Sequence, residues 1–296
     1  MPSDRGVSRF LAWTFGWSWA VWAPLVLAGR GVLGVDADAL AGLTMPLVML
    51  GAFGPAVGAC VAIGSLDGRA ALVRFLRRFA SLRFGWRVWT AIFGVLGSIG
   101  ALAWYLPELF GDARVPMQLP GVYVFPIWLL VMVFLGGGQE EVGWRGYLLG
   151  PLEARFGRWG GNVVLALVWT AWHLPLWFVR GSTQEHMPIV SFVMMTVGLS
   201  FFFSWVIQAS GGRLLSGLVA HGAYNAFIPL FPTHVMAADA PQARWWIHQA
   251  LVLVVGVLFM WRVTRRRSRS DQGRATSQLP PTPSPVASPG TKSLRQ

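Results

Sequence analysis

The residues best suited to chemistry in this chain are polar side chains that interrupt its apolar segments in three short motifs. The first motif follows VFPIWLLVMVFLGGGQ, the second lies in LALVWTAWHLPLWF, and the third lies in LLSGLVAHGAYNAFIPLF. The candidates are Glu140, Glu141 and Arg145 in the first motif, His173 in the second, and His221 and Asn225 in the third. A charge at bilayer depth costs about 2.5–3.5 kcal/mol on insertion scales, so such residues usually have a function.

The first motif contains two adjacent carboxylates whose expected roles differ. Glu141 and Arg145 are four residues apart, which predicts an ordinary salt bridge on one helix face. Glu140 sits about 100° around the helix from Glu141, so one arginine cannot pair ideally with both. A carboxylate without a cation at this position is a candidate general base. The glycines at 136–138 let another backbone or a substrate come close.

The second and third motifs add two histidines and an amide. His173 is expected about 18 Å along its helix from Gly161, near the middle of the membrane. A single histidine there more often only bonds a neighbouring helix, but Trp169 lies one turn earlier on the same face and could wall a site. His221 and Asn225 project from one helix face, one turn apart. Both side chains can donate hydrogen bonds to a developing oxyanion.

Other intramembrane hydrolytic chemistries lack their motifs. Every Asp falls outside the apolar segments, so paired membrane aspartates are absent, and the chain has no HExxH zinc motif. Ser204 or Ser216 could face His221, but no strained serine motif supports such a pair. Cys60 is the single cysteine, which excludes a disulfide framework and a cysteine metal site.

The elements that must position these motifs are membrane helices. Of the residues 54% are hydrophobic and 12% are charged, whereas a soluble domain carries about 25% charged residues. A membrane helix needs about 20 apolar residues. The sequence predicts an all-α, polytopic transmembrane bundle of about eight spans. The spans are expected at 10–29, 41–64, 88–106, 121–138, 161–179, 188–209, 213–231 and 245–263.

The basic residues predict the orientation of these spans. With eight spans, twenty of the 24 Lys and Arg residues fall on the side of the two termini and four on the other side. The positive-inside rule therefore predicts that both termini are cytoplasmic. The net charge of +12 is explained by these loops and the tail, so no nucleic-acid partner is expected.

The predicted organisation has four parts. Residues 1–120 hold about three spans, residues 121–231 hold the motif-bearing core, residues 232–267 hold the last span, and residues 268–296 form a basic, Pro- and Ser-rich cytoplasmic tail. The tail has almost no large apolar residues and is expected to be disordered. In the first part, Gly54 and Gly58 form a small-xxx-small pattern, which predicts close helix packing.

The three motifs, in this order and on separate helices, resemble those of the CPBP family, also called Abi. This family comprises Ras-converting-type CAAX prenyl endopeptidases and bacteriocin-processing or immunity proteins. The motifs read EEVGWR at 140–145, WTAWH at 169–173 and HGAYN at 221–225, and the resemblance covers about residues 120–230. Trp169 stands where phenylalanine is common in the family.

The resemblance implies an intramembrane endopeptidase with a glutamate-activated water. Two versions fit the residues. Glu140, His173 and His221 could hold a catalytic zinc ion, since three protein ligands and a water form such a site. In the metal-free version, which we favour, Glu140 and His173 deprotonate the water, while His221 and Asn225 hold the oxyanion. Arg145 would orient the carboxylates.

Glu141 is expected to pair with Arg145 and to tune Glu140. The implied substrate is a membrane-anchored peptide or protein, of the CAAX type or of the bacteriocin and peptide-maturation type, and the other expected partners are membrane lipids. The expected location is the cell membrane. The alternative is a non-enzymatic scaffold, immunity protein or transporter that uses the same buried residues. A transporter would show related polar sites in both halves, but this chain has them only in the second half.

Overall fold

The computed structural model describes residues 2–32, 40–234 and 242–277, which form helices joined by turns and short loops. This confirms the predicted all-α class. The chain divides into two compact units, Met1–Met260 and Trp261–Gln296. All three motifs lie in the first unit.

The first half of the chain contributes helices before the motifs begin. In chain order they are α1 (Asp4–Gly29), α2 (Ala41–Gly51), α3 (Gly54–Leu66), α4 (Gly68–Arg77), α5 (Trp86–Thr90), the π-helical turn η2 (Ala91–Val95), α6 (Leu96–Tyr105) and the 3₁₀ turn η3 (Leu106–Phe110). The segments α5, η2 and α6 follow one another without a gap, so they form one helical stretch with a π-helical turn in it.

The second half carries the motifs. Its elements are the 3₁₀ turn η4 (Val122–Val124), α7 (Phe125–Phe134), the 3₁₀ turn η5 (Gly138–Glu140), α8 (Glu141–Gly143), the π-helical turn η6 (Trp144–Leu148), α9 (Leu149–His173), the 3₁₀ turn η7 (Leu174–Phe178), α10 (Ile189–Ala209), α11 (Leu215–Phe227) and α12 (Ala243–Ser277). The first motif therefore lies where a 3₁₀ turn, an α-helical turn and a π-helical turn succeed one another.

Six helical stretches of the described residues are long and apolar enough to cross a membrane, so the chain is an integral membrane protein. They are Asp4–Gly29, Gly42–Leu66, Trp86–Phe110, Val122–Phe178, Ile189–Ala209 and Ala243–Arg262. Six is fewer than the eight predicted spans for two reasons. The structure joins the elements from 122 to 178 into one stretch, and α11 has only 13 residues.

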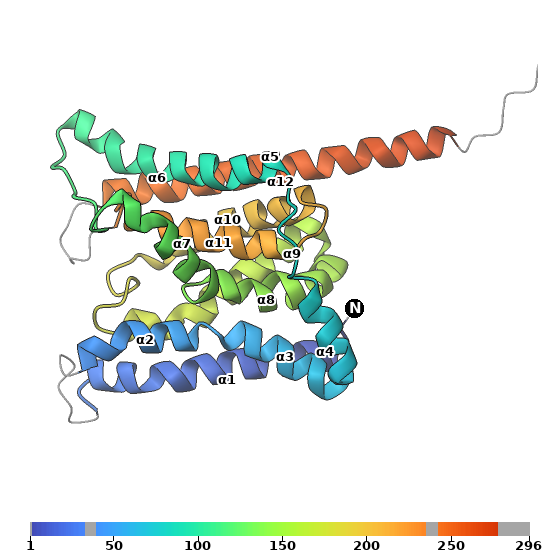
Figure 1. Ribbon diagram of the computed structural model, residues 1–296, viewed down its shortest axis with the longest axis horizontal. Coiled ribbons are helices and arrows are strands. Elements are labelled where there is room, and N and C mark those ends of the chain that lie inside the picture. Colours follow the sequence, from blue (N-terminus) through green and yellow to red (C-terminus); the bar gives the residue numbers. More distant parts are fainter. Residues whose placement is uncertain (1, 33–39, 235–241, 278–296) are drawn as a thin grey trace, which may run out of the picture. The chain divides into compact units, whose positions relative to one another are not determined.

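Helices α1 and α3 lie side by side (Figure 1) because glycine removes the side chains between them. A Cβ atom at Gly54 would lie 2.6 Å from the carbonyl oxygen of Thr14, and one at Gly58 would lie 2.7 Å from that of Phe10. Real Cβ atoms do not approach so closely, which confirms the packing predicted from the small-xxx-small pattern.

A helical hairpin brings the second motif back to the first. The helix that begins at Glu141 breaks inside α9 at Gly157, which has φ 68° and ψ 173°, a conformation that favours glycine. After the break the chain runs back alongside itself, so that a Cβ atom at Gly161 would lie 2.6 Å from the amide nitrogen of Glu153. Trp169 and His173 stand on the returning arm.

Helix α11 packs tightly on α7 and on the glycines that follow α7. A Cβ atom at Gly222 would lie 2.5 Å from the Cα atom of Val133, and one at Gly138 would lie 2.7 Å from the carbonyl oxygen of Leu218. This close approach places the third motif, on α11, directly over the start of the first.

The sequence counts Arg145 among the charges of a segment between two spans, and the structure shows that this charge is buried. Residues 141–156 are helical, and Arg145 is only 5% exposed. Its charge therefore belongs to the protein interior and does not report on the membrane orientation.

The second unit is described as far as Ser277, where α12 ends. Residues 268–277 of the predicted disordered tail are helical as the end of α12, which corrects the prediction there. Residues 278–296 lie outside the described residues, so their disorder stays a prediction.

Candidate active site

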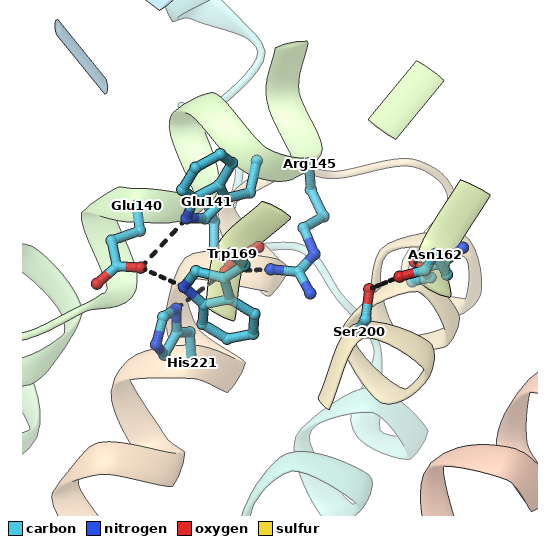
Figure 2. A network of polar contacts seen from close by, with 9 residues as sticks. Glu140, Glu141, Arg145, Asn162, Trp169, Ser200 and His221 are labelled. Carbon is cyan, nitrogen blue, oxygen red and sulfur yellow. Dashed lines mark hydrogen bonds and ion pairs between the residues drawn. The ribbon is translucent and has the colours of Figure 1, made fainter. Parts of the chain in front are cut away.

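Glu141 is the centre of a buried charge cluster built from two helices. Its Oε1 atom accepts hydrogen bonds from Nη1 of Arg145 at 2.7 Å and from Nδ1 of His221 at 2.9 Å. The i,i+4 pair of Glu141 and Arg145 is the one that the sequence predicts. The bond to His221, 80 residues further along the chain, fastens α11 to the first motif (Figure 2).

Arg145 is held between aromatic rings as well as by its carboxylate. Its guanidinium carbon lies 4.9 Å from the ring centroid of Trp169 and 5.2 Å from that of Phe203. Among the described residues its Nε and Nη2 atoms have no hydrogen-bond partner, nor does Oε2 of Glu141. The pair is therefore buried with part of its hydrogen-bonding capacity unused. Unpaired buried polar atoms lower the stability of the fold, so their presence here indicates a function.

Glu140 is held differently, by two uncharged donors. Its Oε2 atom accepts a hydrogen bond from the indole nitrogen of Trp169 at 2.8 Å and from that of Trp144 at 3.2 Å. Its side chain is 4% exposed, and the structure gives it no hydrogen bond or ion pair to Arg145. As the helix geometry suggested, the arginine serves only one of the two carboxylates (Figure 2).

His173 stands at the end of α9 with a defined tautomer. Its Nδ1 atom lies 2.9 Å from the carbonyl oxygen of Trp169, and a carbonyl can only accept, so Nδ1 carries the hydrogen. In the neutral ring this leaves Nε2 with a free lone pair. The rings of Trp172 and Phe192 lie 4.6 Å and 5.0 Å from the imidazole centroid, which limits rotation of the ring.

His221 and Asn225 face the backbone of the glycine segment, as their shared helix face predicts. The Nδ2 atom of Asn225 donates to the carbonyl oxygen of Gly136 at 2.7 Å. A Cβ atom at Gly137 would lie 2.9 Å from Nε2 of His221 and would also overlap Asn225. Gly137 has φ 124°, so both its conformation and its surroundings require glycine.

The three predicted motifs thus meet through a single side chain, Trp169. Its indole bonds Glu140, its ring lies under Arg145, and its centroid lies 5.1 Å from that of His221 and 6.0 Å from that of His173. The wall expected from Trp169 is therefore also the hub of the cluster. Its helix arm reaches this position because of the break at Gly157.

The serines weighed as partners of His221 are engaged elsewhere. Ser216 donates to the carbonyl oxygen of Arg213 at 2.7 Å, and Ser204 donates to Oδ1 of Asn162 at 2.5 Å. Neither forms a hydrogen bond with His221, so the structure supports the exclusion of serine–histidine chemistry.

The zinc set considered from the sequence does not come together as a metal site. Within residues 2–32, 40–234 and 242–277, no group of three His, Cys, Asp or Glu side chains is arranged to hold a metal ion. Glu140 already directs one oxygen to two indoles, and His221 lies against the carboxylate of Glu141. Glu140, His173 and His221 therefore do not fit a shared ion in this structure, and no step below uses one.

Two residues of the site were not singled out from the sequence. Trp144 lies four residues after Glu140, just as Arg145 lies four residues after Glu141, so the same spacing rule could have found it. Gln139 accepts from the amide nitrogen of Gly137 at 2.9 Å and donates to the carbonyl oxygen of Leu135 at 3.0 Å. It fixes the glycine turn, and its sequence position gives no signal for that role.

A family model and one known protein are similar to this chain. Residues 122–227 match the family model described as type II CAAX prenyl endopeptidase, Rce1-like. The chain is also similar to CAAX prenyl protease 2 of Methanococcus maripaludis, with 25% identity over 197 residues that cover 62% of this chain and 72% of that protein. The segment matched by the family model contains all three motifs.

Proposed function

Since this chain belongs to the Rce1-like family of type II CAAX prenyl endopeptidases, we propose that it hydrolyses a peptide bond of a membrane-anchored peptide or protein. The observation that carries the proposal is the buried pair of adjacent carboxylates held in two different ways. Glu141 is paired with Arg145 and His221, while Glu140 is held by two uncharged indoles and has no cation on it.

Glu140 acts as the general base. Two indole donors occupy Oε2, so Oε1 is the oxygen available to take a proton from the attacking water. The uncharged indoles hold the carboxylate without neutralising it, and a positioned base of this kind contributes about 10²–10⁴-fold to a rate. His173 assists through Nε2, the nitrogen that its bond to the Trp169 carbonyl leaves free.

The third motif stabilises the oxyanion that forms on the substrate carbonyl. Asn225 uses one of its two N–H groups on Gly136 and offers the other. His221 directs Nδ1 at Glu141, which makes Nε2 the ring nitrogen for the oxyanion, to which it donates when the ring carries both hydrogens. Removing one such donor from an enzyme typically costs about 10²–10³-fold in turnover.

The substrate class follows from the relative's name and the membrane setting. The relative is called a CAAX prenyl protease, which makes a chain with a prenylated cysteine near its C-terminus the first substrate to test. A substrate of the bacteriocin or peptide-maturation type, anchored by a helix, is the second. Both present a peptide bond close to a lipid-embedded group.

The proposal includes a topology. The chain crosses the cell membrane eight times with both termini in the cytoplasm, and the site opens toward the cytoplasmic half of the membrane. The distribution of Lys and Arg supports this orientation. Without the buried Arg145, nineteen Lys and Arg residues lie on the side of the termini and four on the other side, so the asymmetry remains. The break at Gly157 separates two helical arms, as two successive spans require.

The test uses the full chain, purified and reconstituted into liposomes. One substrate is an internally quenched peptide that ends in a farnesylated cysteine followed by three residues. The second is the same peptide without the prenyl group but fused to a transmembrane helix. Wild type is compared with Glu140→Ala and His173→Ala, and the products are identified by mass spectrometry.

We expect wild type to cleave at least one substrate and both variants to lose the activity. Cleavage that survives in both variants contradicts the assigned base. A folded wild type that cleaves neither substrate and no other membrane-tethered peptide contradicts the peptidase and favours a scaffold, immunity protein or transporter.

A further inference from the structure

Two tryptophan N–H groups converge on one oxygen of Glu140. Trp144 lies four residues later in the chain. Trp169 comes from the returning arm of the hairpin (Figure 2). Both rings are buried, with exposures of 0% and 2%. Since the donors approach from two separate arms, rotation of the carboxylate breaks at least one of the two bonds.

The two adjacent carboxylates are therefore held by parallel but unlike devices. Each glutamate accepts a hydrogen bond from the residue four positions later in the chain. For Glu141 this donor is the cation of Arg145, and for Glu140 it is the uncharged indole of Trp144. An indole only donates and does not titrate in the range of a working enzyme. It can fix the direction of a carboxylate and leave its charge for the reaction.

We propose that Trp169, with Trp144, is a positioning residue that fixes Oε2 of Glu140 so that Oε1 points at the attacking water. The inference rests on the proposed role of Glu140 as the base. It goes beyond the motif pattern, because a phenylalanine at position 169 would keep the wall but has no N–H donor.

A purely packing role for Trp169 makes a different prediction, and the chain offers a matched control. Trp128, on α7, lies outside the three motifs. Its indole nitrogen has no hydrogen-bond partner among the described residues. Trp128→Phe therefore removes the same atoms as Trp169→Phe, without removing a hydrogen bond to Glu140.

The experiment measures kcat and KM in liposomes with whichever of the two quenched peptides wild type cleaves. The variants are Trp169→Phe, Trp144→Phe, the double variant and the control Trp128→Phe, with Glu140→Gln beside them. We expect kcat to fall about 10- to 100-fold for Trp169→Phe, the size expected when a hydrogen bond to a charged group is lost. KM stays within about twofold, the double variant is slower than either single variant, and the turnover of Trp128→Phe stays within about threefold of wild type.

A second replacement guards against a folding defect. Benzothienylalanine at position 169, introduced by nonsense suppression, keeps the shape of the indole and replaces its N–H with sulfur. We expect it to be as slow as Trp169→Phe while unfolding at the temperature of wild type.

The outcomes separate this inference from the proposed function. If Glu140→Gln is inactive but the benzothienylalanine protein turns over like wild type, the positioning role is wrong and the base survives. A raised KM with unchanged kcat in Trp169→Phe also overturns it, because that pattern indicates a binding wall. If Glu140→Gln cleaves like wild type, the proposed function itself has failed.

Discussion

Two buried polar clusters lie along the same hairpin, and they differ in how fully their atoms are paired (Figure 2). The glutamate cluster consists of Glu140, Glu141, Arg145 and His221. The Asn162 cluster consists of Glu153, Asn162, Ser200 and Ser204. Both are enclosed by helices, and both join α9 or its preceding turn to a neighbouring element.

The Asn162 cluster is saturated. Nδ2 of Asn162 donates to Oε1 of Glu153 at 3.1 Å and to the carbonyl oxygen of Arg158 at 2.9 Å. Its Oδ1 atom accepts from Ser200 at 3.1 Å and from Ser204 at 2.5 Å. These four bonds use the full capacity of the amide, so Asn162 has nothing left with which to bind a substrate.

The glutamate cluster contains polar atoms that form no hydrogen bond within the described residues. Glu141 Oε2 and two nitrogens of Arg145 have no partner among the described residues, and Glu140 has no cation on it. Buried polar atoms are nearly always paired where only stability is at stake. The two clusters are centred on buried side chains, Glu141 at 1% and Asn162 at 0% exposure, and their unused hydrogen-bonding capacity distinguishes a helix clamp from the proposed reaction site.

Glu141→Gln should have the largest combined effect. The change removes the anion of Arg145 and leaves a buried guanidinium uncompensated, which costs about 3–5 kcal/mol in the free energy of unfolding. It also releases His221, so cleavage should be lost. SDS-driven unfolding and peptide cleavage measure the two effects.

The matched control is Glu108→Gln, which breaks a pair with Arg114, whose side chain is 72% exposed. Exposed pairs contribute about 0–1 kcal/mol. Equal stability of the two variants would contradict a paired charge at Glu141.

His173→Ala should lower turnover by about 10²–10⁴-fold, because it removes the proton-transfer partner of Glu140. The control is His186→Ala, because His186 lies outside the motifs. Its Nε2 atom is 4.0 Å from Oε2 of Glu185, which is a long distance for an ion pair. Steady-state cleavage by the two variants is compared with wild type. Retention of more than a tenth of the turnover in His173→Ala would remove this residue from the mechanism.

Asn225→Ala should lower turnover by about 10²–10³-fold through loss of an oxyanion donor. Asn225→Asp sharpens the test, because it preserves the size of the side chain but places a negative charge where the oxyanion forms. We expect the aspartate variant to be at least as slow as the alanine variant. An aspartate variant that turns over like wild type would show that position 225 does not face the oxyanion.

Asn162→Ala should have the smallest effect on chemistry. Turnover should stay within about threefold of wild type, while the free energy of unfolding falls by about 1–3 kcal/mol, because saturated bonds are lost from a helix clamp. Thermal unfolding, monitored by tryptophan fluorescence, tests the predicted loss of stability, and peptide cleavage tests the predicted turnover. An Asn162→Ala protein with normal stability and low turnover would contradict the distinction between the two clusters.

Sequence spacing predicted the local half of the site. The four-residue intervals gave the Glu141–Arg145 pair and the common face of His221 and Asn225, because a helix repeats nearly every four residues. Gly54 and Gly58 likewise predicted a close helix contact, which the structure confirms.

The remainder depends on where the chain turns back. Trp169 reaches Glu140 only because the helix breaks at Gly157, and His221 reaches Glu141 only because α11 packs on the glycines after α7. Neither contact has a local spacing that encodes it. The eight-span count also assigned Arg145 to a connecting segment, because hydropathy cannot separate a loop charge from one buried beside a carboxylate.

The central claim is that Glu140 is the base and that the Asn162 cluster is only structural. The most direct measurement compares turnover and unfolding temperature for Glu140→Gln and Asn162→Ala in the same liposome assay. The account predicts a loss of about a thousandfold or more in turnover for Glu140→Gln, within the range of a general base, at an almost unchanged unfolding temperature, and the reverse pattern for Asn162→Ala. Turnover near that of wild type in a folded Glu140→Gln protein would contradict it.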